Sequence, residues 1–397
     1  MKILRIVYDW PPPWQGLAPH PYEITVFQAK RGYEIELFCG RWPNAGSIEN
    51  PPNVNIHPII REPFPGTISF TSSVILFFQY LSWRKRNKVD IIHSHGHFAI
   101  WIYFYRFILR KFLPWKEELK TPLVVHFHNT VKGRWEAMEE SGAGIKPQSK
   151  YLAWPLAMFS DRLAVQVAAA CIFVSEENKK EAIKYYKVDP QKCFVVESGV
   201  NSSLFKPVGD EEKEKTRKDL GLDMLDKVVL NYGAVVERKN VHLLVDALPY
   251  LPALYKLILA GSGDPAYIET INEMIKKKNL ADRVLRVGYI PYPQVPVAIQ
   301  ASDVFVLPSS WEGLPKVVIE SLACGVPCLV SGFKLSEDVK GVYYLDDLDP
   351  KYIAKRIVEI VENIREVDVN KMVSLYSWDQ KVLQIEQIYE FAKKNYL

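Results

Sequence analysis

Two glutamates and two adjacent cations in the second half of the chain have types and spacing that could do chemistry. Glu312 lies in a turn after the apolar run DVFVLP, and Glu320 follows it by eight positions. Arg238 and Lys239 come shortly after another apolar run, KVVLNYG. A carboxylate is an acceptor with two oxygens and could hold both hydroxyls of a ribose, whereas paired cations could neutralise a phosphate. Spacing alone leaves the chemistry open, because two glutamates at this distance are common by chance.

The segment between these two glutamates adds a second feature that suits phosphate. Pro315 is expected at the first position of a helix, where its missing N–H costs nothing. A helix that begins directly after a strand and a turn points backbone N–H groups and the positive end of its dipole at a ligand. We therefore expect the turn that carries Glu312 to border a phosphate.

The elements that must position these residues follow from the apolar pattern. Short β-branched runs alternate with helix-period segments, and the strand candidates include KILRIVY, DIIHSH, PLVVHFH, KVVLNYG and DVFVLPSS. Continuous apolar strands separated by helices imply parallel sheets covered on both faces. The pattern changes near Pro207 to GDEEKEKTRKDLGL, a charged stretch without a buried face, which we interpret as a linker followed by a solvated helix.

The pattern predicts an α/β protein with two Rossmann-like, doubly wound domains that face a central cleft. We place the first domain at residues 1–206 and the second at residues 207–377, and we expect a helix at about 378–397 to pack back on the first. Ligands of open α/β sheets bind at the carboxyl ends of the strands, so the cleft is the expected site.

Composition and charge argue against several classes of function. Fifty basic and 46 acidic residues leave a net charge of +4, which does not favour nucleic acid as a partner. Five cysteines without a CxxC pair indicate reduced thiols in a cytoplasmic protein. The apolar run before Asp9 is too short for a secretory signal, and FTSSVILFFQYLSW and GHFAIWIYFY fall short of the roughly 18 uncharged residues of a membrane-spanning helix.

A specific resemblance to a known family comes from the segment PSSWEGLPKVVIESLACGVP. It resembles the signature of the retaining glycosyltransferases of family four (group 1), which have the GT-B fold. That signature is a pair of glutamates in the frame PS-x-x-EG-x-P…E-x-x-A-x-G-x-P. The resemblance implies that Glu320 binds the ribose of a nucleotide. It also implies that Glu312, Gly313 and Leu314 lie beside the donor sugar and the diphosphate.

A second match is the segment YGAVVERKNVHLLVDAL, which is similar to the family's G-R-x-x-x-x-K-G-x-x-x-L-x-x-A. It implies that Gly233 borders the donor. Arg238 and Lys239 would neutralise the charge that develops on the departing nucleoside diphosphate, so that no divalent metal and no cofactor is required. Asn240 stands where the family usually has glycine. This difference affects how tight the turn can be, but not the two cations before it.

The first half of the chain carries thinner matches. The segment WPPPWQGLAPHPYEITVF occupies the place of the family's P-P-x-x-G-G loop, with Gly16 matching and Leu17 in place of the second glycine. Both are expected close to the diphosphate. HFHNT resembles the family's T-x-H segment, which makes His128 the candidate for a hydrogen bond to the transferred sugar. In the second half, LRVGYIPYPQ is expected near the base, with a backbone contact at Tyr289.

His93 and His95 match the family's D-x-x-H-x-H strand. Alternate residues share one face of a strand, so the pair has a spacing that metal ligands use. No third ligand is apparent in the sequence, and the family needs no metal. We therefore expect both histidines to contribute to sheet packing and to the lining of the cleft.

The resemblance implies a retaining glycosyltransferase of the hexosyltransferase type. Its substrates would be a nucleotide-sugar donor and the hydroxyl of a sugar, glycan, glycolipid or lipid-linked acceptor. Three alternatives stay open: a nucleotide-sugar epimerase or hydrolase of the same fold, a two-lobed sugar-binding protein without chemistry, and a glycosidase. A glycosidase would need two carboxylates about 5–10 Å apart across one sugar bond, which Glu312 and Glu320 could approach, but it would leave the expected phosphate site unexplained.

Contact with a membrane surface is a separate hypothesis. The segments SSVILFFQYLSWRKRNK and AIWIYFYRFILRKFLPWK combine bulky apolar residues with basic clusters, as interfacial helices do. Core helices with basic ends would have the same composition. We expect a cytoplasmic protein and leave open whether it also attaches to the inner face of the membrane.

Overall fold

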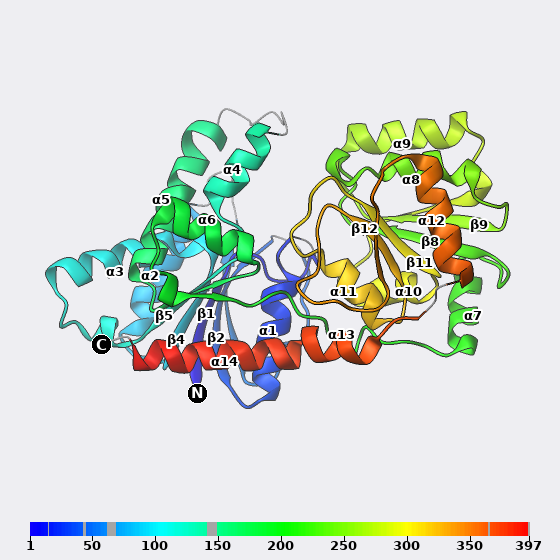
Figure 1. Ribbon diagram of the computed structural model, residues 1–397. Helices are drawn as coiled ribbons and strands as arrows, with labels where there is room; N and C mark the ends of the chain where they lie inside the picture. Colours follow the sequence, from blue (N-terminus) through cyan, green and yellow to red (C-terminus); the bar gives the residue numbers. More distant parts are fainter. Residues whose placement is uncertain (15, 43–44, 62–68, 141–148, 364–365, 396–397) are drawn as a thin grey trace. The chain divides into compact units, whose positions relative to one another are not determined.

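The computed structural model describes residues 1–14, 16–42, 45–61, 69–140, 149–363 and 366–395, and its strands and helices alternate along the chain (Figure 1). Two compact units result, one from Met1–Ser198 with Trp378–Leu397 and the other from Gly199–Ser377. The sequence had placed this division at 206 and 207. The segment after Ser198 joins the second unit, because the Val200 N–H donates to the Tyr376 carbonyl at 2.7 Å and Val200 forms a parallel bridge with Ser377.

The first unit is built on a seven-stranded parallel sheet with the order β3-β2-β1-β4-β5-β6-β7. The strands are β1 (Lys2–Val7), β2 (Glu34–Arg41), β3 (Val54–Ile60), β4 (Ile91–His95), β5 (Leu123–Phe127), β6 (Ala170–Phe173) and β7 (Cys193–Val195). The strand order reverses between β1 and β4. The loops that follow these strands therefore lie at a topological switch point, where α/β sheets bind ligands.

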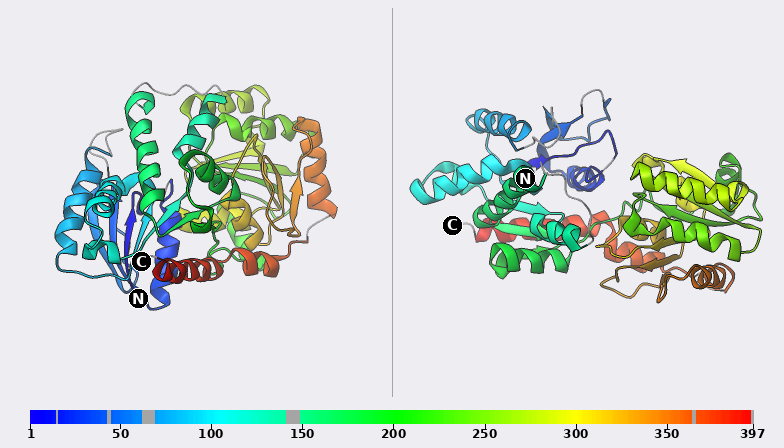
Figure 2. Two further views of the ribbon diagram at one scale, coloured as in Figure 1. Left: turned by 60° about the vertical axis from the view of Figure 1, so that its left-hand side comes forward. Right: turned by 90° about the horizontal axis from the view of Figure 1, so that it is seen from above.

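Helices cover both faces of this sheet. They are α1 (Pro19–Lys30), α2 (Ser72–Arg84), α3 (Ile100–Phe112), α4 (Val131–Glu140), α5 (Trp154–Val167), α6 (Glu176–Tyr186) and α14 (Trp378–Lys394). Leu4 and Val125 belong to a core shared with α2, α3, α5 and α6, whereas Ile3 and Val124 belong to a core shared with α1 and α14. Helix α14 comes from the C-terminal end of the chain and lies beside α1 (Figures 1 and 2).

The second unit is built on a six-stranded parallel sheet with the order β10-β9-β8-β11-β12-β13. The strands are β8 (Lys227–Tyr232), β9 (Tyr255–Ala260), β10 (Val284–Gly288), β11 (Val304–Pro308), β12 (Cys328–Ser331) and β13 (Val342–Tyr344). The helices are α7 (Asp210–Asp219), α8 (Val241–Ala247), α9 (Pro265–Lys277), α10 (Val295–Gln300), α11 (Lys316–Ala323), α12 (Pro350–Asn363) and α13 (Val369–Tyr376). Helices α8, α9 and α12 share a core on one face of the sheet, and α10 and α11 lie on the other (Figure 1). The prediction of two parallel α/β sheets is therefore confirmed.

Helix α7 corrects one expectation. Its charged sequence was interpreted as a solvated helix, but Arg217 is buried and its Nη2 lies 2.7 Å from Asp303 Oδ2. The Nε of Arg217 donates to the Ala301 carbonyl at 2.9 Å, and Lys213 Nζ forms a second ion pair with Asp303 at 3.0 Å. Polar contacts of a guanidinium dock this helix, and a search for apolar periodicity cannot detect them.

Candidate active site

In the second unit the predicted site residues gather at the carboxyl ends of β8 and β11. These strands are neighbours at the centre of the sheet, and the strand order reverses between them. The chain after β8 passes through Gly233 to a short 3₁₀ helix, Glu237–Lys239, and the chain after β11 passes through Glu312 to α11. The Ser310 N–H donates to the Arg238 carbonyl at 2.8 Å, so the two turns are joined.

Glu312 contacts both cations of the predicted pair. Its Oε1 lies 3.0 Å from Arg238 Nη1 and 3.5 Å from Lys239 Nζ. Ser309 Oγ donates to the same oxygen at 3.0 Å, and Arg238 Nη1 also donates to the Trp311 carbonyl at 2.9 Å. One carboxylate thus holds two positive groups at the edge of the sheet where α/β proteins bind their ligands.

Lys239 and Arg238 differ in their exposure to solvent. The Lys239 side chain is 11% exposed, whereas the Arg238 side chain is 47% exposed. Burial lowers the pKa of the Lys239 ammonium; the Glu312 carboxylate raises it only partway back, and the Arg238 charge lowers it further. A second anion at this position would therefore stabilise the charged form of Lys239.

Two backbone conformations shape the turn after β8. Gly233 has φ +140°, and a Cβ at this position would lie 2.9 Å from Lys239 Nζ, so glycine makes room for the ammonium. Asn240 is left-handed, with φ 49° and ψ 37°, and its Nδ2 donates to the Pro308 carbonyl at 2.9 Å and to Ser310 Oγ at 3.0 Å. Asparagine tolerates this conformation, so the turn stays tight where the family usually has glycine.

Glu320 is buried in α11, with 3% of its surface exposed. Its charge helps to raise the pKa of the Tyr232 phenol at the end of β8, although burial is the larger cause. Tyr289, which follows β10 and is exposed, contributes to the same shift. The Glu320 carboxylate and these two tyrosines are therefore close enough to interact at one edge of the sheet.

The start of α11 differs by one residue from the prediction. The helix begins at Lys316, and Pro315 is its N-cap with an extended ψ of 113°. Proline has no side-chain acceptor, so it cannot cap the N–H groups of the first turn as serine or aspartate would. Gly313 is exposed and Leu314 is half-buried just before this helix end.

In the first unit, Gly16 and Leu17 lie between β1 and α1. Gly16 has φ +60°, and a Cβ there would lie 3.2 Å from Asp9 Oδ2, so the position favours glycine. Leu17 is exposed, and its carbonyl accepts a hydrogen bond from the His20 N–H at 3.1 Å. The part of this loop at residue 15 lies outside the described residues.

His128 follows directly after β5 and is half-buried. Its Nε2 lies 3.2 Å from His95 Nδ1. Its ring stacks on that of His126, with 5.1 Å between centroids, and meets the His20 ring edge-on at 4.6 Å. These contacts hold the imidazole at the carboxyl end of the strand, where the sequence placed it.

The structure adds residues that sequence reasoning missed. His126 is the third member of a buried group with His93 and His95, and His20 packs against it from α1. His95 and His126 are partners in the β4–β5 register. A signal was present, because HFH has the same alternate spacing as HSH.

Comparison with known proteins gives the family. Residues 14–204 match the family model described as Glycosyltransferase Family 4, and residues 212–366 match the model described as Glycosyl transferases group 1. The chain therefore belongs to the family 4, group 1 glycosyltransferases, and it is an enzyme of this class.

Individual relatives are distant but span most of the chain. An uncharacterized glycosyltransferase, MJ1607, of Methanocaldococcus jannaschii is 22% identical over 99% of this chain and 98% of its own. A D-inositol 3-phosphate glycosyltransferase of Xylanimonas cellulosilytica is 26% identical over 84% of this chain and 80% of its own. The crystal structure of Anabaena Alr3699/HepE in complex with UDP and glucose matches with a TM-score of 0.74 at 17% identity, covering 98% of this chain and 99% of that one. This likeness confirms the predicted GT-B class of fold.

Proposed function

We propose that the enzyme transfers a sugar from a nucleoside-diphosphate sugar to the hydroxyl of a sugar, glycan or lipid-linked acceptor. We further propose that it retains the anomeric configuration and needs no metal ion at the diphosphate. The observation that carries this proposal is the Glu312 carboxylate between Arg238 and Lys239 at the ends of β8 and β11. The bound UDP in the complex of the Anabaena protein supports a nucleoside diphosphate as the class of donor.

In this proposal the second unit holds the nucleotide. Arg238 and Lys239 supply fixed positive charge to the diphosphate, and the start of α11 adds backbone N–H groups. Glu320 accepts the two hydroxyls of the ribose. The backbone at Tyr289 contacts the base, and Gly233 lets the ligand approach the end of β8 closely.

The reaction exchanges one bond at the anomeric carbon for another. The bond to the diphosphate oxygen breaks, the acceptor oxygen bonds to the same face, and the acceptor's proton passes to the leaving diphosphate. Glu312, Gly313 and Leu314 border the sugar in this proposal, and Gly16 and Leu17 border the diphosphate. His128, oriented by its contact with His95, donates a hydrogen bond to the transferred sugar.

The test begins with the donor. We would screen UDP-, GDP-, ADP- and TDP-sugars for a rise in the melting temperature, because a ligand that binds only the folded protein stabilises it. The best donor would then be assayed for nucleoside diphosphate release with and without candidate acceptors, and the product's anomeric configuration determined by NMR. Release that requires an acceptor, with retention, supports the proposal. Equal release without any acceptor would instead indicate a hydrolase.

Metal independence has its own test. Addition of Mg²⁺ or Mn²⁺ to metal-depleted enzyme should leave the transfer rate unchanged, because Arg238 and Lys239 already neutralise the diphosphate. A rate that depends on either ion would overturn this part of the proposal.

The described residues contain no helix that is long and apolar enough to span a membrane. We propose instead that α2, α3 and the turn after α3 touch an anionic lipid surface. These two neighbouring helices bury part of their apolar residues in the core of the unit but leave large ones exposed. The exposed ones are Ile75, Phe78, Phe104, Phe112 and Trp115.

Exposed basic residues lie near the ends of these helices at Arg86, Arg110, Lys111 and Lys116, whereas Arg84 is turned inward to Glu118 at 3.1 Å. A surface that combines both kinds of residue should bind vesicles with acidic lipids and release them partly at high salt. Sedimentation with phosphatidylserine vesicles measures this. Phe78→Ser with Trp115→Ser should weaken binding, whereas Leu225→Ser, at an exposed apolar side chain of the second unit, should not. Equal binding by all three proteins would refute the proposal.

A further inference from the structure

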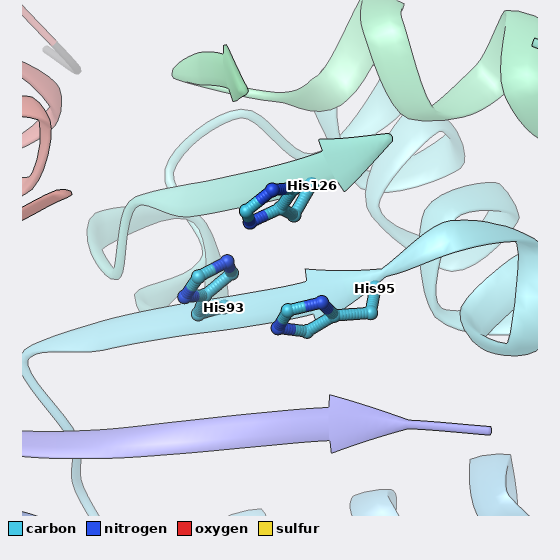
Figure 3. Close-up of side chains that lie close together, drawn as sticks. All are labelled: His93, His95 and His126. Carbon is cyan, nitrogen blue, oxygen red and sulfur yellow. The ribbon is translucent and has the colours of Figure 1, made fainter. Parts of the chain in front are cut away.

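A row of histidine rings in the first unit leads to His128. His93 and His95 come from β4 and His126 from β5, and Figure 3 shows their rings on the same side of the two strands. His128 lies two residues after His126, and the planes of these two rings are parallel within 6°. His20 of α1 meets the His128 ring edge-on. The proposed hydrogen bond to the transferred sugar therefore starts from a ring that other imidazoles contact.

His95 and His128 meet through one nitrogen of each ring. His95 Nδ1 lies 3.2 Å from His128 Nε2, whereas the ring centroids are 5.5 Å apart and the planes differ by 20°. Because the nitrogens are so much closer than the centres, the two rings meet edge to edge and nearly in one plane, not face to face. A proton on either nitrogen points at the other nitrogen, as a hydrogen bond requires.

The surroundings of His95 decide which ring donates. Burial lowers the pKa of His95 well below its usual value, and the nearby imidazoles and Arg5 lower it further, so this ring is neutral and carries one N–H. If His128 donated, that N–H would be at His95 Nε2, which is buried and has no hydrogen-bond partner among the described residues. Buried N–H groups without an acceptor are rare in proteins, and unpaired acceptors are less so. The positive charge of Arg5 also favours a lone pair over an N–H at this nitrogen.

We infer that His95 is the positioning residue that fixes the tautomer of His128. The Nδ1–H of His95 donates to His128 Nε2, so the proton of a neutral His128 ring lies on Nδ1. His128 then offers an N–H at Nδ1 and has no lone pair there. This role rests on the proposed function, in which His128 bonds to the transferred sugar, and it makes His128 a hydrogen-bond donor and not a general base. The proposed reaction needs no such base, because the acceptor's proton passes to the diphosphate.

Two other rings keep His128 in this orientation. The His126 ring lies parallel to it with 5.1 Å between centroids, and the His20 ring meets it edge-on at 4.6 Å. His20 is itself held, since its Nδ1 lies 3.1 Å from Ser198 Oγ. A half-turn of the His128 ring would put a carbon where Nε2 lies and leave the Nδ1–H of His95 without an acceptor. A buried donor without a partner is costly, so the ring keeps one orientation.

The first test reads the tautomer in the free enzyme and needs no substrate. The full chain would be labelled with nitrogen-15 histidine, and two-bond proton–nitrogen correlations at neutral pH would distinguish the two neutral tautomers. His128→Gln would identify the signals of His128 by their loss. We expect a proton on Nδ1 and a lone pair on Nε2. A proton on Nε2 of His128, alone or in a mixture of both tautomers, would overturn the inference.

The second test separates the N–H of His95 from its packing. His95→Leu removes the donor, whereas His95→Asn places an amide N–H near the position of Nδ1. With the best donor sugar, kcat should fall about tenfold in His95→Leu, as expected for the loss of one hydrogen bond, and KM should change by less than about threefold. His95→Asn should recover kcat to within about threefold of the wild type. Wild-type kcat in His95→Leu, or an equal loss in both variants, would contradict the positioning role.

His57→Leu is the matched control, because the His57 ring contacts Glu36 and lies outside the row that leads to His128. It should keep both the wild-type kcat and the tautomer of His128, and circular dichroism would show that each variant is folded. Failure of the proposed function is distinguishable from failure of this inference. If no donor supports transfer, the proposed function fails, while the wild-type spectrum still reports the tautomer. If transfer occurs but His128 carries its proton on Nε2, only the positioning role fails.

Discussion

Replacement of Lys239 by methionine tests the proposed chemistry most sharply. The variant keeps a chain of similar length but removes the buried positive charge that lies 3.5 Å from Glu312 Oε1. A diphosphate charge at the distance that Glu312 Oε1 has from the ammonium would attract it by about 4.7 kcal/mol at an effective dielectric constant of about 20. Only the part of this attraction that grows as the diphosphate departs lowers the barrier. Loss of one preorganised group of this kind costs roughly 2.7–4 kcal/mol, so we expect kcat to fall about 10²- to 10³-fold.

The same substitution should leave the fold intact. Burial lowers the pKa of Lys239, which means that its charged form is less favourable in the folded protein than in the unfolded chain. Glu312 also keeps Arg238 and Ser309 as partners at 3.0 Å each. We therefore expect the free energy of unfolding of Lys239→Met to equal or exceed that of the wild type.

The assay is steady-state transfer with the donor found in the melting screen, beside urea unfolding. Lys340→Met is the matched control, because Lys340 pairs with Glu366 in an exposed ion pair of the same unit. That control should keep wild-type kcat. The reasoning is wrong if Lys239→Met is folded and turns over within threefold of the wild type.

Four further outcomes follow from the same structure. Lys239 acts only while protonated and its pKa in the free enzyme is lowered, so kcat/KM should fall as the pH rises through a value below the usual ~10.4; a kcat/KM profile flat to that value would contradict this. Glu320→Gln should weaken nucleoside diphosphate binding about 10- to 100-fold in calorimetry, because hydrogen bonds to a charged acceptor contribute about 1.5–3 kcal/mol; unchanged affinity would exclude the ribose role. Asn240→Ala should be about 1 kcal/mol less stable in urea than Asn240→Gly, since only the alanine is strained at φ 49°, and equal stabilities would argue against that strain. Burial raises the pKa of Asp161 to about 7, whereas its carboxyl in the unfolded chain titrates near ~3.9. Because the folded state then binds the extra proton, this group should make the free energy of unfolding fall between about pH 4 and pH 7, and Asp161→Asn should flatten that slope; an equal slope in both proteins would refute it.

Much of the fold was predictable because apolar patterning reports which segments are buried strands. Runs such as KVVLNYG and DVFVLPSS are buried on both faces, so the parallel sheets and the gathering of Arg238, Lys239 and Glu312 at strand ends followed from the pattern and the resemblance. What periodicity reports is the face on which a side chain lies. It does not report which strand will be the neighbour.

The features that were missed depend on such neighbours. His126 joins His95 only because β5 pairs with β4 in a register that places the two rings opposite each other. Arg217 docks α7 through Asp303, a contact between segments far apart in the chain. The position of the unit boundary likewise depends on the bridge from Val200 to Ser377. Each requires the sheet order or a long-range polar contact, and a single sequence shows neither.

The most direct test of the central claim is a crystal structure of the enzyme with a nucleoside diphosphate bound. We expect Arg238 and Lys239 within hydrogen-bonding distance of the phosphate oxygens, and the Glu320 carboxylate on the ribose hydroxyls. A diphosphate bound away from both cations, or one neutralised by a divalent ion in their place, would contradict the account.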